Sequence, residues 1–267
     1  MPVTDILTPT NIKDAIKLVQ NGGIVLSGGQ ALLPDLRQGK YLNQEINLIE
    51  LSNISEIEAK LNIDHNKISI GALTSVAQLI ENREIKERAS ILIEACEHLG
   101  DCQIRNSATL GGNLCWGESR ANLLIALIAL SASVKIIDHS EKVREVHLDN
   151  FYRDKILNEK KDFILLSVDI PIDNWVCTSY QEFSRQKNDL ALVNLATVEL
   201  EDSLSGCIGG LFVSPFKFKI ENKKQLLENT ISLVENAKLE KLKNQYADFQ
   251  HRLNILKSLF TETSKVK

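Results

Sequence analysis

The sequence predicts an α+β protein, in which short buried strands alternate with helices and a small antiparallel sheet follows near the end. Three observations support this: helical periodicity near the start, short apolar runs between turn residues, and a change of pattern after Pro171. Beyond Pro171, β-rich stretches are separated by turns, which is typical of an antiparallel meander. These stretches lie at about 176–185, 190–200 and 205–213. The change of pattern predicts a domain boundary near 171–176.

Helices are expected where apolar residues recur on one face. The stretch 11–21 has such a face, Thr10 can cap its start, and Gly22 can follow its end. Another helix is expected over 75–82, with Thr74 as its cap. The remaining helices are expected over 84–99, 120–131, 222–240 and 246–261.

Strands are expected where short apolar or alternating runs are bounded by turn residues. The run 24–26 is followed directly by the tight turn Ser27-Gly28-Gly29-Gln30, and the run 163–170 is closed by Pro171. The stretches 134–138 and 143–148 are expected to pair with one another. Two further strands are expected over 48–51 and 67–72.

Composition and charge exclude several classes of protein. With 267 residues, of which 43% are hydrophobic and 25% charged, the chain can bury a sizeable core and is neither disordered nor collagen-like. The net charge of −4 gives no indication of nucleic-acid or membrane-surface binding. The longest apolar run, 123–130, is far shorter than the ~20 residues of a membrane span. No signal peptide is visible at the start.

The cysteines and histidines favour a cytoplasmic chain without a metal site. The five cysteines form no C-x-x-C pair, which predicts reduced structural thiols, and the five histidines lack metal-ligand spacing. From Lys217 onward there are 11 basic and 6 acidic residues. This excess is interpreted as a solvated helical face, with a docking surface for an acidic partner as the alternative.

Two glycine motifs carry the strongest chemical signal, Ser27-Gly28-Gly29-Gln30 and Thr109-Leu110-Gly111-Gly112-Asn113. Glycine pairs let backbone N–H groups approach a ligand closely, and successive N–H groups can form an anion-binding nest. Each motif alone fits an ordinary turn, whereas the two together suggest a diphosphate held from two sides. Neither has the spacing of a dinucleotide-binding Rossmann motif or of a P-loop.

Four stretches of the chain resemble one family. They are 27–34 (SGGQALLP), 70–74 (IGALT), 98–114 (HLGDCQIRN followed by TLGGNL), and 165–191 (LLSVDIP, YQEFSR and DLA). Over about residues 5–255 the chain resembles the FAD-binding medium subunit of the molybdenum hydroxylases. Members of this family include the carbon monoxide dehydrogenase medium chain and the xanthine dehydrogenase FAD-binding subunit.

The resemblance implies a fold. Residues 1–173 would form a two-lobed FAD-binding domain of the p-cresol methylhydroxylase/vanillyl-alcohol oxidase type, with lobes over about 1–55 and 56–173 and FAD between them. Residues 174–267 would form a C-terminal domain of the carbon monoxide dehydrogenase flavoprotein type. This domain would be a three-stranded antiparallel sheet packed on helices.

The resemblance also implies which residues bind FAD. The two glycine motifs would wrap the pyrophosphate, largely through backbone N–H groups. Leu99 would be an apolar flavin contact or a core leucine, the backbone of Leu165 would meet the isoalloxazine, and Lys187 would reach the flavin or be an exposed turn lysine. The implied cofactor-binding residues are Ser27, Gly28, Gly29, Gln30, Ala31, Leu32, Leu99, Thr109, Leu110, Gly111, Gly112, Asn113, Asn122, Leu165 and Lys187. No catalytic residue and no metal ligand is expected on this chain.

The sequence departs from the family pattern at several places. Asn122 stands where the family has aspartate, which keeps hydrogen-bonding capacity but loses the charge. Glu182 stands where many relatives have lysine, and the stretch 115–120 is unusual. Within that stretch, Trp116 is interpreted either as a packed loop residue or as a stacking partner for a ring of FAD. The family pattern of the closing helix is degraded in 246–260.

The resemblance implies electron transfer through FAD within a larger complex. A large partner subunit would carry molybdopterin, a small one would carry two-iron clusters, and FAD would pass electrons to a nicotinamide nucleotide, a quinone or oxygen. One alternative is a flavin-dependent reductase or oxidase that acts alone on the same fold. A second is a non-catalytic scaffold subunit that has lost or weakened FAD binding.

Overall fold

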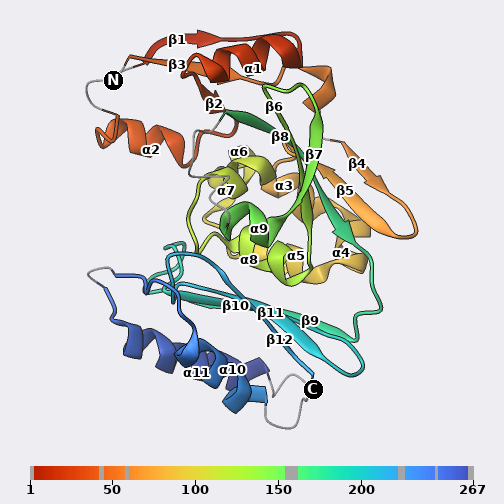
Figure 1. Cartoon of the computed structure of the whole chain (residues 1–267), viewed down its shortest axis with the longest axis vertical. Helices are drawn as coiled ribbons and strands as arrows, with labels where there is room; N and C mark the ends of the chain where they lie inside the picture. The colour runs from red at the N-terminus through yellow and green to blue at the C-terminus, as the bar shows by residue number, and fades with distance from the viewer. Residues whose placement is uncertain are drawn as a thin grey trace. The chain divides into compact units, whose positions relative to one another are not determined.

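The computed structural model describes residues 3–41, 45–57, 60–153, 162–221, 226–243 and 246–263 (Figure 1). The chain forms two compact units. Unit 1 comprises Met1–Glu81, Cys102–Gly117 and Ser133–Ile170, and unit 2 comprises Asn82–Asp101, Glu118–Ala132 and Pro171–Lys267. Two segments from the first half of the sequence, 82–101 and 118–132, therefore group with the C-terminal third. The domain division at residue 173 stays a prediction.

Unit 1 begins with a small parallel sheet in the order β1-β3-β2. The helix expected over 11–21 is present, but Asn11 caps it instead of Thr10, because the Asn11 side chain accepts from the Asp14 N–H at 3.0 Å. Gly22 follows the helix with a φ of +89°, as a terminating glycine does. The elements are β1 (Val3–Leu7), α1 (Ile12–Gln20), β2 (Ile24–Leu26), α2 (Leu32–Arg37) and β3 (Ile46–Glu50).

The second sheet of unit 1 has the order β4-β5-β8-β6-β7, and the pair expected from 134–138 and 143–148 is its β6–β7 hairpin. The Asp169 carboxylate on β8 is buried and accepts from Lys67 at 3.0 Å and Lys135 at 2.8 Å, so it links three neighbouring strands. The strands are β4 (Leu61–Ile63), β5 (Lys67–Gly71), β6 (Ser133–Asp138), β7 (Val143–His147) and β8 (Phe163–Pro171).

Short helices complete unit 1. The helix expected over 75–82 is α3, and its cap is Ser75, one residue later than expected. Ser75 Oγ accepts from the Gln78 N–H at 3.2 Å, and Gln78 Oε1 accepts from the Ser75 N–H at 2.8 Å. This reciprocal pair is a capping box. The helices are η1 (Ser55–Ile57), α3 (Val76–Glu81), α6 (Cys102–Ser107), α7 (Leu110–Cys115) and α9 (Leu148–Arg153).

Unit 2 contains an antiparallel sheet in the order β12-β11-β10-β9. The prediction of three strands is wrong by one, because β12 adds a fourth. The sequence contains the signal for this strand, because lysine and apolar residues alternate over 217–220. In the structure Lys217 and Lys219 are exposed while Phe218 and Ile220 are buried. The strands are β9 (Cys177–Phe183), β10 (Val193–Glu199), β11 (Leu204–Gly209) and β12 (Phe216–Ile220).

Helices cover this sheet on both faces (Figure 1). The helices α5 and α8 contact β9, β10 and β11, while α10 and α11 join Val193 and Leu195 of β10 in one apolar cluster. The helix expected over 84–99 is broken at Ala89, whose φ is −146° and whose side chain is buried. The helices are α4 (Arg83–Arg88), α5 (Ser90–Glu97), α8 (Asn122–Ala129), α10 (Leu226–Asn236) and α11 (Phe249–Thr263).

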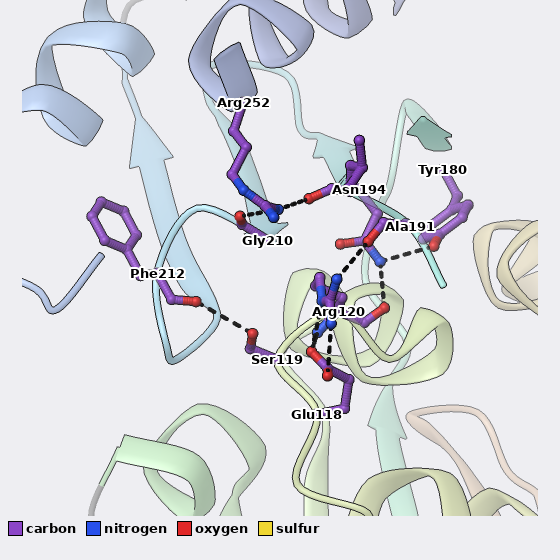
Figure 2. Close-up of polar contacts among 10 residues, drawn as sticks. Glu118, Ser119, Arg120, Tyr180, Ala191, Asn194, Gly210, Phe212 and Arg252 are labelled. Carbon is purple, nitrogen blue, oxygen red and sulfur yellow. Dashed lines mark hydrogen bonds and ion pairs between the residues drawn. The ribbon is translucent and has the colours of Figure 1, made fainter. Parts of the chain in front are cut away.

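Arg252 joins α11 to two turns of unit 2 (Figure 2). The side chain is fully buried, and its Nη1 donates to the carbonyl oxygens of Leu192 and Gly210. Leu192 directly precedes β10 and Gly210 directly follows β11, so one guanidinium joins the two strands at the same end of this antiparallel pair, where Asn194 lies opposite Gly209. Among the helices described, none is long and apolar enough to cross a bilayer.

Candidate functional site

The two glycine turns meet in unit 1. Ser27 Oγ and Thr109 Oγ1 lie 2.7 Å apart, within hydrogen-bond distance, although the residues are far apart in sequence. A Cβ on Gly28 would lie 1.9 Å from the carbonyl oxygen of Ser107, so a side chain at this position is excluded. Gly29 has a φ of +70°, in the left-handed region. The first turn therefore needs both glycines, one for close approach and one for its backbone conformation.

The first turn presents a run of unpaired donors. Within the part of the chain that the structure describes, the backbone N–H groups of residues 28–32 have no hydrogen-bond acceptor. The Gly29 carbonyl accepts from the Leu33 N–H at 2.9 Å, which starts α2 directly after the turn. Gln30 is exposed, whereas its neighbours in the turn are half-buried. Successive free N–H groups of this kind suit an anionic ligand such as a phosphate.

The second turn uses its backbone donors inside the protein. The N–H groups of Leu110 and Gly111 donate to the carbonyls of Thr74 and Ala72 at 2.9 and 2.8 Å. Those of Gly112 and Asn113 donate to Thr109, through Oγ1 at 3.1 Å and the carbonyl at 3.0 Å. A Cβ on Gly111 would lie 2.9 Å from the Ala72 Cβ. The glycines here allow close packing, and α7 is anchored on the segment that follows β5.

Instead of backbone N–H groups, the second turn and the segment that follows β5 offer polar side-chain atoms. Among the described residues, Asn113 Oδ1 and Thr74 Oγ1 are buried and have no hydrogen-bond partner. A buried unpaired polar atom costs about 1–3 kcal/mol, so such atoms are normally satisfied by a ligand or water. The Thr74 carbonyl accepts from the Leu110 N–H, and Asn113 lies three residues further along the same turn. This set of free donors and acceptors fits a cofactor that carries both phosphate and hydroxyl groups, as FAD does.

Leu165 lies close to the same segment. It is on β8, buried, opposite Ile136 of β6, and a bulge interrupts the register between Lys135 and Ile136 there. The next residue, Leu166, accepts from the Ala72 N–H at 2.9 Å. Because Gly111 packs against Ala72, the strand that carries Leu165 is brought beside the second glycine turn.

Three further predicted residues belong to unit 2. Leu99 follows α5 and is half-buried, and Asn122 begins α8 and is buried. Lys187 is exposed, next to Asn188, whose φ is +70°. The structure thus brings together the two glycine motifs and Leu165 in unit 1, while Leu99, Asn122 and Lys187 lie apart in sequence within unit 2.

Two departures from the family pattern are in direct contact. Asn122 Nδ2 donates to Glu182 Oε2 at 2.7 Å, and Tyr180 Oη donates to the same oxygen at 3.0 Å. His98 Nδ1 lies 3.5 Å from Glu182 Oε1, and this contact raises the pKa of His98. Burial, followed by the Glu182 charge, raises the pKa of Tyr180, which therefore stays a donor. Sequence reasoning singled out Asn122 and Glu182 separately and missed both their contact and the role of Tyr180.

The unusual stretch 115–120 includes a well-bonded turn of unit 2 (Figure 2). The Arg120 guanidinium binds Glu118 through two hydrogen bonds of 2.8 and 3.0 Å and donates to the Ala191 carbonyl at 3.4 Å. Asn194 donates to the Arg120 carbonyl at 2.9 Å. Trp116 is 38% exposed, so its ring is not packed away in the core. In the described ranges, no cluster of three His, Cys, Asp or Glu side chains could hold a metal ion.

Comparison with known proteins shows the family. The family described as the FAD binding domain in molybdopterin dehydrogenase matches residues 2–173. The glyceraldehyde dehydrogenase medium chain of Sulfolobus acidocaldarius is 24% identical over 216 residues, which cover 78% of this chain and 75% of that protein. The carbon monoxide dehydrogenase medium chain of Hydrogenophaga pseudoflava is 24% identical over 198 residues, which cover 71% of this chain and 67% of that protein.

Solved structures agree on the fold. A chain of quinoline 2-oxidoreductase from Pseudomonas putida 86 matches with a TM-score of 0.82 at 20% identity, covering 97% of this chain and 94% of that one. A chain of the Cu,Mo-CO dehydrogenase matches with a TM-score of 0.84 at 18% identity, covering 97% and 96%. The predicted α+β fold and the predicted resemblance are confirmed. With its family match over most of the sequence, this chain belongs to the FAD-binding domain family of the molybdopterin dehydrogenases.

Proposed function

We propose that this chain is the FAD-binding medium subunit of a molybdenum hydroxylase and transfers electrons through its FAD. The observation that carries the proposal is the run of free N–H groups at residues 28–32, beside the contact between Ser27 and Thr109. A diphosphate needs such donors, and the family match supplies the identity of the cofactor. When bound, FAD supplies the redox chemistry, and the protein supplies binding, orientation and electrostatics.

The residues of this chain would divide the binding between them. The N–H groups of 28–32 would hold the diphosphate, and Gly28 would let the first turn lie against Ser107. The free oxygens of Thr74 and Asn113 would bond to hydroxyl groups of the cofactor. Leu165 would contribute backbone contacts from β8. Leu99, Asn122 and Lys187 remain proposed contacts from unit 2.

Partner subunits complete the proposed function. The relatives are named medium chains or subunits of dehydrogenases and hydroxylases. By analogy, a large subunit with molybdopterin and a small subunit with two-iron clusters would deliver electrons to this chain. The acceptor would be a nicotinamide nucleotide, a quinone or oxygen, and the complex would be cytoplasmic.

The visible absorption spectrum of the purified chain tests the proposal. The spectrum is recorded alone, after FAD addition and desalting, and again on the complex co-expressed with its partners. Bands near ~370 and ~450 nm, with about one FAD retained per chain, are expected. A chain that retains no FAD in either form would refute the proposal and favour a scaffold subunit. A chain that retains FAD and turns over a substrate without partners would favour an enzyme that acts alone.

A further inference from the structure

Glu182 is a buried carboxylate that accepts hydrogen bonds from several directions. Its side chain is only 7% exposed. Tyr180 Oη and Asn122 Nδ2 both donate to Oε2, and His98 Nδ1 lies near Oε1. An ionised carboxylate has no proton to donate, so every polar atom that contacts it must be a donor.

This requirement fixes the orientation of the Asn122 amide. The nitrogen and oxygen of an amide are hard to distinguish by shape, and the hydrogen-bonding partners decide between them. Glu182 Oε2, at 2.7 Å, can face only the NH₂ end of Asn122. The carbonyl Oδ1 therefore points away from Glu182. Within the residues that the structure describes, no donor reaches that oxygen.

Glu182 is held by Tyr180 as well as by Asn122. Tyr180 donates to Glu182 and itself accepts from Asn194 Nδ2 at 3.1 Å, and Asn194 is fully buried. Glu182 is thus held by a chain of side chains on two adjacent strands, β9 and β10. A rigid acceptor of this kind can orient a neighbouring side chain.

We propose that Glu182 is a positioning residue that holds Asn122 with Oδ1 presented as a hydrogen-bond acceptor for a hydroxyl group of bound FAD. Asn122 then offers the same acceptor that an aspartate would offer, without bringing a second carboxylate against Glu182. An aspartate at this position would place two like charges within hydrogen-bond distance, which is unfavourable unless one is protonated. Glu182 therefore makes asparagine, and not aspartate, the compatible residue at 122. This inference rests on the proposed FAD-binding function.

Exchange of the two groups tests the inference. The variants are Asn122→Asp, Glu182→Gln and the double variant. In the double variant, the amide introduced at position 182 would donate to the carboxylate introduced at position 122, which reverses the hydrogen bond. FAD dissociation constants are measured for each by flavin fluorescence, relative to wild type at the same pH. We expect Glu182→Gln to weaken binding about 10-fold, the equivalent of one charge-assisted hydrogen bond.

The aspartate variant carries a pH signature. Asn122→Asp should weaken binding by about 10-fold or more while both carboxyls are ionised, and the loss should shrink as acid protonates one carboxyl of the pair. The double variant should recover to within about 3-fold of wild type, with the remaining loss coming from Tyr180, which must redirect its hydroxyl. His98, whose pKa Glu182 raises, titrates in the same pH range, so each comparison is made with wild type at the same pH. A purely structural role would not produce the rescue of affinity in the double variant.

Several results would overturn the inference. The first is a double variant that binds no better than Asn122→Asp. The second is that Asn122→Asp and Glu182→Gln each bind FAD as tightly as wild type does. This result overturns the inference even if urea unfolding of the apo chain shows that residues 122 and 182 are coupled in stability. In both cases wild type still binds FAD, so the proposed function survives. A wild-type chain that never binds FAD overturns the function and this inference together.

Discussion

Substitution of Gly28 by alanine should abolish FAD retention. The new Cβ would lie 1.9 Å from the Ser107 carbonyl oxygen, whereas an ordinary contact begins at 3.4 Å. The first turn must therefore move by about 1.5 Å, at an overpacking cost of about 1–3 kcal/mol. The 2.7 Å contact between Ser27 and Thr109 would be lost as well, which adds about 1 kcal/mol. We expect the free energy of unfolding to fall by about 2–4 kcal/mol.

The effect on FAD should be larger than the effect on stability. Hydrogen bonds of about 2.9 Å do not survive a shift of 1.5 Å, and a bond to a charged phosphate is worth about 1.5–3 kcal/mol. Loss of two such bonds raises the dissociation constant more than about 100-fold. The assay is FAD titration followed by flavin fluorescence, with urea unfolding of the apo chain measured in parallel.

Gly22→Ala is the matched control. Gly22 has a φ of +89° and open space around its Cβ position, so alanine there costs about 1 kcal/mol of backbone strain without a clash. This variant should lose stability and keep its FAD affinity. If Gly28→Ala binds FAD as tightly as Gly22→Ala does, the argument from close approach of the two turns is refuted.

Three further predictions concern Arg252, His98 and Asp169. Arg252→Met should lower the free energy of unfolding by about 2–5 kcal/mol in urea titrations, because two buried carbonyls lose their donor. Glu182 raises the pKa of His98 above 6.5, so the stability that His98 contributes is present below that pH and lost as pH rises through the raised value. The stability difference between wild type and His98→Gln should therefore shrink above pH 6.5 in pH-dependent unfolding. Burial opposes ionisation of Asp169, but its three hydrogen bonds outweigh that effect and lower its pKa below 3.8. In acid unfolding, the stability advantage of wild type over Asp169→Asn should therefore persist above pH 3.8 and disappear as the pH falls through the lowered pKa.

Local signals in the sequence predicted most elements of the fold. The periodicity of 11–21, the apolar runs and the alternating stretches after Pro171 each depend on residues a few positions apart, so they can be recognised without tertiary information. The errors have local causes too. Two adjacent polar residues compete for each cap, as Thr10 and Asn11 do, and periodicity does not reveal a single non-helical residue such as Ala89.

The candidate site was predicted only in part. The glycine motifs could be found because close approach and a left-handed backbone demand glycine, and Gly28 and Gly29 meet those two demands. Which turn keeps its N–H groups free could not be predicted. That depends on the carbonyls of Thr74 and Ala72, which belong to a different segment of the chain and occupy the donors of the second turn.

The sequence by itself determined most of the longer helices and strands, the two glycine motifs and the family to which they point, but not short elements such as β1 and β4. Only the tertiary structure decided that Ser27 meets Thr109, that segments 82–101 and 118–132 pack with the C-terminal sheet, and that Asn122 is bonded to Glu182. The physical reason is range. Propensity, periodicity and a left-handed backbone such as that of Gly29 act locally. Close approach, as between Gly28 and Ser107, and hydrogen bonds and buried charges depend on whatever partner folding brings within about 3 Å.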